Sequence, residues 1–409
     1  MSHFKYFREK LFIEKTSVLN IVKKNKTPFY LYSSKQIEEN YINFSKIFKN
    51  VNPLICFAAK ANTNLTIMWI LGKLGSGADV VSGGELLKAL KAGIKPNKIV
   101  FSGVGKTEDE LKLAIKNKIL LINVESESEA ILVNKIGKKF NKIISIGFRI
   151  NPNVDAKTHK KISTGKSENK FGVSIKNFSS FYKNIKQFKN LEINAVSVHI
   201  GSQILSAAPY KKTLDVLSKV IINLKIKLKY VDLGGGFGIK YSKNDKKINL
   251  NNYAKLVYDF KKKLNCNIIF EPGRSLVGNT GVLVSKIQYI KKGLNKNFII
   301  IDAGMNDFMR TALYDASHDI VPIIKTKKKY QEAIEFVGPI CETTCKFIKY
   351  KKYQEIKEGD FVAITNVGAY GSSLSSNYNT KPLVAEILAS KKNFKIIRKK
   401  QDLLKLINS

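Results

Sequence analysis

Short apolar runs alternate with longer amphipathic segments along the chain from about residue 53 onward. The runs occupy positions 54–59, 78–82, 99–102, 119–122, 143–150, 195–200, 230–233 and 268–270. Most are separated by a segment of helical length with apolar residues three and four positions apart, such as 85–93, which closes on a glycine. Eight alternating strand and helix units within roughly 220 residues predict a (β/α)8 barrel rather than an open sheet.

The pattern changes after about residue 278, where the apolar segments become shorter and strand-like. Examples are 282–289, 298–302 and 361–365, and turn sequences occur at 292–293 and 358–360. We therefore expect an α/β protein with a barrel domain at 36–277 and a β-rich second domain at 278–409. Residues 1–35 contain the strand-like segment 29–32 and are expected to complete the second domain.

The chain is strongly basic, with a formal net charge of +39 over 409 residues. Such a charge is typical of proteins that bind nucleic acid or an anionic membrane. Only five of the 71 basic residues are arginines, however, and the 66 lysines are spread over the whole chain. Nucleic-acid binders usually concentrate their basic residues and use arginine for two-pronged phosphate contacts. We interpret the charge as a compositional bias on solvated surfaces without a nucleic-acid partner; a nucleic-acid-binding barrel remains the competing class.

The sequence predicts neither a membrane partner nor export. No apolar run approaches the ~18 residues that a membrane span requires, and the first residues lack the apolar core of a signal peptide. The four cysteines fit no disulfide framework, and Cys341 and Cys345 have no second cysteine or histidine pair nearby to complete a zinc site. We expect free thiols, no bound metal and a cytoplasmic location.

Polar residues and glycines gather at the C-terminal ends of the expected barrel strands. In a barrel these ends meet on one face, where such enzymes keep their chemistry. Lys60 follows the first strand, and a desolvated lysine amine loses its proton readily and can attack an aldehyde. On position alone, however, Lys60 is one of 66 lysines, and a solvated surface charge is the simpler interpretation.

Three further strand ends carry groups suited to a flat cofactor with a phosphate. Clustered glycines at 234–238 let backbone N–H groups approach a phosphate, although a plain tight turn would also explain them. Glu271 could keep a pyridine nitrogen protonated, with Arg274 nearby for an anion; an ordinary surface ion pair is the alternative. His199 could stack on the cofactor with Ser202 on the phosphate, or it could be a buried histidine satisfied by the backbone.

Together these residues resemble the diaminopimelate decarboxylase family, one of the alanine-racemase-like (fold type III) families that use pyridoxal 5'-phosphate (PLP). The resemblance runs from Phe57 to Asn379, nearly the whole chain. Its ten elements are AAKAN (58–62), DVVSGGEL (79–86), RINP (149–152) running to NKFG (169–172), HIGSQ (199–203), GGGFG (234–238), EPGR (271–274), GMND (304–307), YDA (314–316), GPICE (338–342) and GAYG (368–371). Each element is weak alone, but ten in the family's order are highly specific.

The resemblance implies a role for each matching residue. Lys60 is similar to the catalytic lysine that holds PLP as a Schiff base, and Cys341 to the acid that protonates the substrate carbon across a homodimer interface. The implied cofactor-binding residues are Lys60, His199, Ser202, Gly235, Gly236, Glu271, Pro272, Gly273, Arg274 and Tyr370. The implied substrate-binding residues are Arg274, Arg310, Tyr314, Glu342 and Tyr370. The segment 154–170 is similar to a mobile loop over the site.

The reaction that the resemblance implies is decarboxylation of meso-2,6-diaminopimelate to L-lysine and CO2, the last step of lysine biosynthesis. The far end of this small-molecule substrate carries a carboxylate, suited to Arg310 with Arg274, and an ammonium, suited to Glu342. Decarboxylation of another basic amino acid, such as ornithine or arginine, stays open as the alternative. The family usually has an aspartate where this chain has Cys345, which puts the positioning of Cys341 in question.

Overall fold

The structure is a computed structural model that describes residues 3–156, 164–165, 169–241, 245 and 248–408. The chain divides into two compact units. The barrel unit comprises residues 41–239 and 246–275, and the β unit comprises residues 1–40, 240–245 and 276–409. The domain bounds expected from the sequence remain a prediction.

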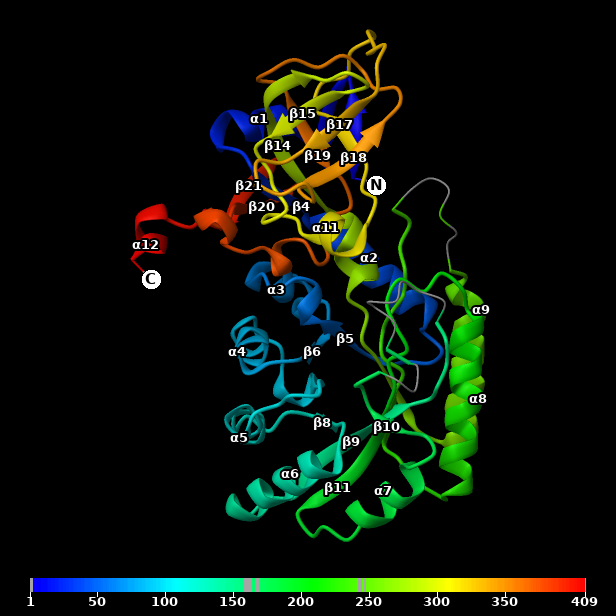
Figure 1. Ribbon diagram of the computed structural model, residues 1–409. Helices are drawn as coiled ribbons and strands as arrows, with labels where there is room; N and C mark the ends of the chain where they lie inside the picture. Colours follow the sequence, from blue (N-terminus) through cyan, green and yellow to red (C-terminus); the bar gives the residue numbers. More distant parts are fainter. Residues whose placement is uncertain (1–2, 157–163, 166–168, 242–244, 246–247, 409) are drawn as a thin grey trace. The chain divides into compact units, whose positions relative to one another are not determined.

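Eight parallel strands of the described barrel unit close into a barrel, so the predicted (β/α)8 fold is confirmed (Figure 1). The strands are β5 (Leu54–Ala58), β6 (Gly77–Val80), β7 (Ile99–Phe101), β8 (Leu121–Val124), β9 (Ile144–Asn151), β11 (Leu191–Ser197), β12 (Tyr230–Asp232) and β13 (Asn267–Phe270). Each strand pairs in parallel with the next, and β13 pairs with β5 to close the ring. The short β10 (Val173–Ser174) pairs with β9.

Helices connect successive strands, as the amphipathic segments predicted (Figure 1). They are α2 (Ser34–Ile47), α3 (Leu65–Lys73), α4 (Gly83–Lys91), α5 (Glu108–Lys116), α6 (Glu127–Lys139), α7 (Phe178–Ile185), α8 (Ala208–Asn223) and α9 (Leu250–Leu264). Ser82, Thr107 and Ser126 each accept the backbone N–H of the residue three positions later and so begin α4, α5 and α6. In the part of the chain that the structure describes, no helix is long and apolar enough to cross a membrane.

Two strands differ most, at both ends, from the apolar runs that predicted them. The run at 119–122 became β8, which continues past Asn123 because this amide side chain finds buried hydrogen-bond partners. The run at 195–200 became β11, which starts at Leu191 and ends at Ser197. Apolar periodicity therefore located both strands but missed ends where a polar side chain is buried.

The β unit is built from two sheets, which bears out the predicted β-rich second domain. A small antiparallel sheet contains β1 (Phe4–Phe7), β2 (Lys10–Ile13) and β3 (Thr16–Ser17), followed by α1 (Val18–Lys24). The larger sheet contains β4 (Phe29–Ser33), β14 (Gly281–Lys292), β15 (Asn297–Ile301), β16 (Ile320–Pro322), β17 (Ile334–Val337), β18 (Lys346–Tyr350), β19 (Phe361–Ile364), β20 (Ala385–Ser390) and β21 (Asn393–Arg398). The N-terminal β4 lies between β14 and β20 in this sheet.

Candidate active site

A cavity of about 360 Å³ lies in the barrel unit. Its wall is formed by Lys60, Val81, Ser102, Gly103, Val104, Asn123, Arg149, Thr164, Phe171, Ser197, Val198, His199 and Glu271. Most of these residues stand at or just beyond the C-terminal ends of barrel strands. This is the face on which barrel enzymes build their sites, and the volume falls in the range of small-molecule pockets.

Lys60 lies in a short 3-10 turn, Ala59–Ala61, directly after β5. Its Nζ is 2.7 Å from Oδ2 of Asp79, a fully buried residue of β6. A buried carboxylate keeps the lysine amine in the cavity wall, away from the solvated lysines of the surface. Lys60 lies at the barrel mouth, as expected. Asp79 belongs to the 79–86 motif, but the sequence assigned this residue no role.

Glu271 and Asp232 form a pair of hydrogen-bonded, buried carboxyl groups at the ends of β13 and β12. Burial raises the pKa of Asp232 to about 6. Burial and the neighbouring charges of Asp232 and Asp79 raise the pKa of Glu271 well above its ordinary value. Ser102 Oγ donates to Glu271 Oε1 at 3.3 Å, and Asn123 Nδ2 donates to Asp232 Oδ2 at 3.2 Å. Glu271 is therefore a carboxyl that holds a proton easily, not half of a surface ion pair.

Asp232 links the stability of the protein to pH. Its pKa rises from an ordinary 3.8 to about 6 on folding, so the folded form binds this proton more tightly. The stability gained is full below about pH 4 and is lost as the pH rises through about 6. Because the Asp232 and Glu271 carboxyl groups titrate together, we expect Asp232→Asn to weaken the pH dependence of the free energy of unfolding between about pH 4 and pH 7. Urea denaturation between about pH 4 and pH 7 measures this, with exposed Asp215→Asn as the control; a wild-type pH slope in Asp232→Asn would contradict it.

His199 contributes its ring to the cavity wall, but one ring nitrogen is also bound to the backbone. Nδ1 accepts the N–H of Gly235 at 3.2 Å, as expected of a buried histidine that bonds to the backbone, and the stacking of His199 on a cofactor stays a prediction. Burial and the charges of Lys60 and Arg149 lower its pKa well below the ordinary value, which makes the imidazole neutral. A Cβ on Gly235 would stand 2.1 Å from the Glu271 carbonyl oxygen, so this turn requires glycine. Because the Gly235 N–H is donated to His199, its expected contact with a phosphate remains a prediction.

The end of β13 packs closely against the end of β5, which carries Lys60. A Cβ on Gly273 would lie 3.0 to 3.1 Å from the Cβ atoms of Ala61 and Ala58, and the Pro272 carbonyl accepts the Ala58 N–H at 3.2 Å. The next residue, Arg274, donates from Nη2 to Ser202 Oγ at 3.0 Å. The structure therefore brings the 271–274 motif beside both the lysine strand and the serine that were expected to share its site.

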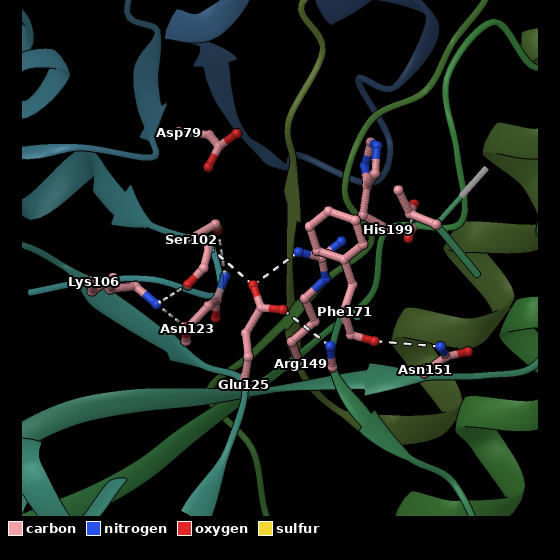
Figure 2. Close-up of polar contacts among 12 residues, drawn as sticks. Asp79, Ser102, Lys106, Asn123, Glu125, Arg149, Asn151, Phe171 and His199 are labelled. Carbon is pink, nitrogen blue, oxygen red and sulfur yellow. Dashed lines mark hydrogen bonds and ion pairs between the residues drawn. The ribbon is translucent and has the colours of Figure 1, made fainter. Parts of the chain in front are cut away.

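A second polar cluster involves residues that sequence reasoning gave no role. Arg149 Nη1 is 2.9 Å from Glu125 Oε1, and Figure 2 shows the Phe171 ring lying over the guanidinium, 4.6 Å from Cζ. Glu125 also accepts the backbone N–H groups of Gly103 and Gly172, both at 3.0 Å. These contacts fix one side of the cavity. Their position at strand ends was the signal that could have identified them.

The cavity wall also contains buried polar atoms to which a bound ligand could form hydrogen bonds. Asn123 Oδ1 and Ser197 Oγ have no hydrogen-bond partner among the described residues. Buried polar atoms are nearly always hydrogen-bonded, so a polar ligand fits this cavity better than an apolar one. An amine, a carboxyl with a raised pKa and a neutral imidazole suit an aromatic aldehyde with a basic ring nitrogen, which describes PLP. Within the described ranges, no cluster of His, Cys, Asp or Glu could hold a metal ion.

The β unit carries the other expected site residues. Arg310 is buried in α11 (Arg310–Tyr314), with its Cζ 5.9 Å from the centre of the Tyr314 ring. Cys341 and Glu342 lie between β17 and β18, where Cys341 is exposed and Glu342 accepts hydrogen bonds from Tyr378 and Thr344. Tyr370 follows β19 and has a φ of 55°. The structure thus brings Arg310 and Tyr314 together and places Cys341 and Glu342 on a separate loop.

Cys345 stands where the family usually has an aspartate, and it still forms hydrogen bonds with its neighbours. The buried Sγ accepts the N–H of Met305 at 3.3 Å, and the Cys345 carbonyl accepts the N–H of Gly338 at 2.9 Å. Burial raises the pKa of this thiol, so it is neutral where a carboxylate would be charged. Cys345 therefore still anchors the loop that begins at Cys341.

The expected mobile loop, 154–170, is described only at 154–156, 164–165 and 169–170, so most of this prediction lies outside the described residues. Val154 donates its N–H to the Gly165 carbonyl at 2.9 Å. Thr164 Oγ1 donates to the His199 carbonyl at 2.7 Å and lines the cavity. The second contact places residues 164–165 beside His199, and the first joins them to Val154.

The fold and the cavity match one class of protein, the pyridoxal-dependent decarboxylases. The family described as "Pyridoxal-dependent decarboxylase, pyridoxal binding domain" matches residues 34–278. Diaminopimelate decarboxylase of Aquifex aeolicus is 42% identical over 403 residues, covering 98% of this chain and 95% of the relative. The Vibrio cholerae enzyme of that name is 40% identical over 411 residues, covering 99% and 98%.

Solved structures agree with these relatives. Diaminopimelate decarboxylase from Helicobacter pylori, complexed with L-lysine, is 43% identical with a TM-score of 0.91, covering 96% of this chain and 98% of the other. Diaminopimelate decarboxylase from m. jannaschii, in co-complex with L-lysine, has a TM-score of 0.93 at 36% identity, covering 99% of this chain and 96% of the other. The chain belongs to the diaminopimelate decarboxylase family.

Proposed function

We propose that the protein decarboxylates meso-2,6-diaminopimelate to L-lysine and CO2 with PLP as cofactor, the last step of lysine biosynthesis. The observation that carries this proposal is a barrel-mouth cavity lined by Lys60, His199 and Glu271. This cavity occurs in a chain 40% or more identical to diaminopimelate decarboxylases over nearly its full length. PLP, when bound, supplies the electron sink that accepts the charge left when CO2 departs.

The barrel unit supplies most of the cofactor contacts in this proposal. Lys60 would hold the cofactor through its amine, which the ion pair with Asp79 keeps in place. Glu271 would supply a proton to the cofactor's ring nitrogen, which its raised pKa favours, and the neutral His199 ring would contact the cofactor. The other proposed cofactor contacts are Ser202, Gly235, Gly236, Pro272, Gly273, Arg274 and Tyr370.

The stereochemistry of the substrate determines which of its two ends loses CO2. Meso-diaminopimelate has one L and one D centre, and because the product L-lysine retains the L centre, CO2 must leave from the D centre. The L centre is then the distal end, with an ammonium and a carboxylate to be bound. We assign the carboxylate to Arg310 with Arg274, the ammonium to Glu342, and further substrate contacts to Tyr314 and Tyr370.

After CO2 has left, the carbon that carried it requires a proton. Cys341 is the proposed donor, acting as general acid. Its side chain is exposed in the single chain, which leaves the thiol accessible to a second subunit. We propose a cytoplasmic homodimer in which each active site combines Lys60 of one chain with Cys341 of the other, without nucleic-acid or membrane partners.

Substrate choice tests the proposed function. We expect CO2 release from meso-diaminopimelate to exceed release from ornithine or arginine by roughly a hundredfold or more in kcat/KM, because a bound carboxylate and a paired ammonium each add binding energy. The measurement is CO2 release by purified holoenzyme with each amino acid at several concentrations. A preference for ornithine or arginine would replace the proposal with the alternative decarboxylase.

A further inference from the structure

The carboxyl group of Glu271 is backed by a second carboxyl group that does not reach the cavity. Glu271 lines the cavity wall, whereas Asp232 is fully buried and does not line it. The two side chains are hydrogen-bonded to each other and stand at the ends of the paired strands β13 and β12. A molecule in the cavity would therefore contact Glu271 and not Asp232.

Three neighbouring donors are committed to fixed acceptors around this pair. Asn123 Nδ2 donates to Asp232 Oδ2 and to Ser102 Oγ, both at 3.2 Å, and Figure 2 shows the second of these contacts. Because Ser102 accepts from Asn123, its own hydrogen goes to Glu271 Oε1 at 3.3 Å. The backbone N–H of Gly234 donates to Asp232 Oδ1 at 2.9 Å. The hydrogen bond between the two carboxyl groups therefore requires a proton of its own.

The arrangement of donors places this proton on Glu271 and the negative charge on Asp232. Asp232 accepts from Asn123 and Gly234 in addition to its bond with Glu271, whereas Glu271 accepts from Ser102. Hydrogen bonds to a carboxylate favour its charged form, and two adjacent buried carboxylates cannot both ionise without a large cost. In agreement, the pKa of Glu271 is raised well above its ordinary value, by burial and by the Asp232 charge, and that of Asp232 to about 6. Above about pH 6 the pair therefore carries one proton and one negative charge.

The other titratable groups around the pair, within the described part of the chain, are neutral or mutually compensated. Asp79 and Lys60 form an ion pair with 2.7 Å between oxygen and nitrogen, so their charges largely offset each other. Burial raises the pKa of the Cys56 thiol well above its ordinary value, and burial lowers that of His199, so both groups are neutral. The negative charge behind Glu271 is therefore the main electrostatic influence on this carboxyl group.

We infer that Asp232 is a positioning residue for the cofactor: its buried negative charge holds one proton at the contact between Glu271 and the ring nitrogen of PLP. This inference rests on the proposed function, in which Glu271 supplies that proton. A negative charge beside a protonated site opposes loss of the proton, whether the proton is on the carboxyl group or on the ring nitrogen. Asp232 itself does not touch the cofactor and acts through Glu271.

Asp232→Asn removes this charge with little change in side-chain size. We expect the ring nitrogen of bound PLP to lose its proton at a pH about one to two units lower in Asp232→Asn than in the wild type. The measurement is solid-state nitrogen-15 NMR of holoenzyme reconstituted with PLP labelled at the ring nitrogen, because protonated and neutral pyridine nitrogens give well-separated signals. Spectra are recorded from about pH 6 to about pH 10. Identical pH profiles in the two proteins would overturn the inference.

Ser102→Ala is the matched control, since it disturbs the same hydrogen-bond network but keeps the charge of Asp232. It removes the hydrogen donated to Glu271 Oε1, which favours the ionised form of that carboxyl group. The ring nitrogen of this variant should therefore lose its proton at the wild-type pH or at a higher one. A shift to lower pH as large as that of Asp232→Asn would assign the effect to the geometry of the network, and the inference on the charge would fail.

Glu271→Gln distinguishes the inference from the proposal on which it rests. If the ring nitrogen of Glu271→Gln keeps its proton as in the wild type, the role of Glu271 fails first and that of Asp232 falls with it. If Glu271→Gln loses the proton but Asp232→Asn has the wild-type profile, the inference on Asp232 alone is overturned. If Asp232→Asn does not fold, the equally neutral Asp232→Ser takes its place with the same expected shift. If neither variant folds, the wild type decides: a ring nitrogen that is neutral at about pH 7 overturns the inference, and a protonated one supports it.

Discussion

Replacing Lys60 with alanine is expected to abolish the visible absorbance of the bound cofactor and to lower CO2 release by roughly a thousandfold or more. The substitution removes the amine that would bond to the cofactor aldehyde at the end of β5. It also leaves the buried Asp79 carboxylate without the ammonium that lies 2.7 Å away in the wild type. The measurements are the absorption spectrum after dialysis against PLP-free buffer and CO2 release from meso-diaminopimelate.

Lys229→Ala is the matched control for this variant. Lys229 forms an exposed ion pair with Glu192, 2.8 Å apart, and immediately precedes β12. Exposed pairs contribute little to stability, so the control should retain both the absorbance and the activity. If Lys60→Ala kept a wild-type spectrum and rate, Lys60 would not hold the cofactor and would be one surface lysine among 66.

Cys341→Ala should still bind PLP with a wild-type spectrum but turn over more slowly by a factor of roughly 10²–10⁴. The reason is that the thiol is proposed to deliver one proton after CO2 has left, a step separate from holding the cofactor. Spectral titration with PLP and steady-state CO2 release measure the two properties. Cys266→Ala, at a buried cysteine, is the control variant. Unchanged turnover in Cys341→Ala would refute the assignment of Cys341 as the proton donor.

Mixing the two inactive variants tests whether the active site is shared between subunits. A dimer of one Lys60→Ala chain and one Cys341→Ala chain would have one intact site and one doubly defective site. Random exchange should therefore restore about a quarter of the wild-type activity. Mixtures that stay inactive after exchange, shown by native mass spectrometry to contain mixed dimers, would place Lys60 and Cys341 of each site on the same chain.

The fold was predictable because the burial of strands and helices produces a regular pattern of apolar residues in the sequence. Parallel barrel strands are buried on both sides, so each one appears as an apolar run followed by an amphipathic helix. The prediction weakened wherever the barrel buries polar groups. Asn123 interrupts the apolar run of β8, and its side chain forms hydrogen bonds with Ser102 and Asp232 inside the barrel. From apolar periodicity alone, such a polar residue predicts the end of a strand.

The candidate site was predictable where a strand-end position coincides with a family motif, as with Lys60 and Glu271. It was not predictable where the chemistry depends on a partner distant in sequence. The pairing of Lys60 with Asp79 and of Asp232 with Glu271 requires knowing which strands are neighbours and which side chains point inward.

The absorption spectrum of the purified protein, recorded before and after addition of meso-diaminopimelate, tests the central claim most directly. A PLP-dependent diaminopimelate decarboxylase should show a visible cofactor band that changes on addition of the substrate, with L-lysine and CO2 accumulating in equal amounts. A protein reconstituted with PLP that shows no visible band, or a band that ornithine changes and meso-diaminopimelate does not, would contradict it.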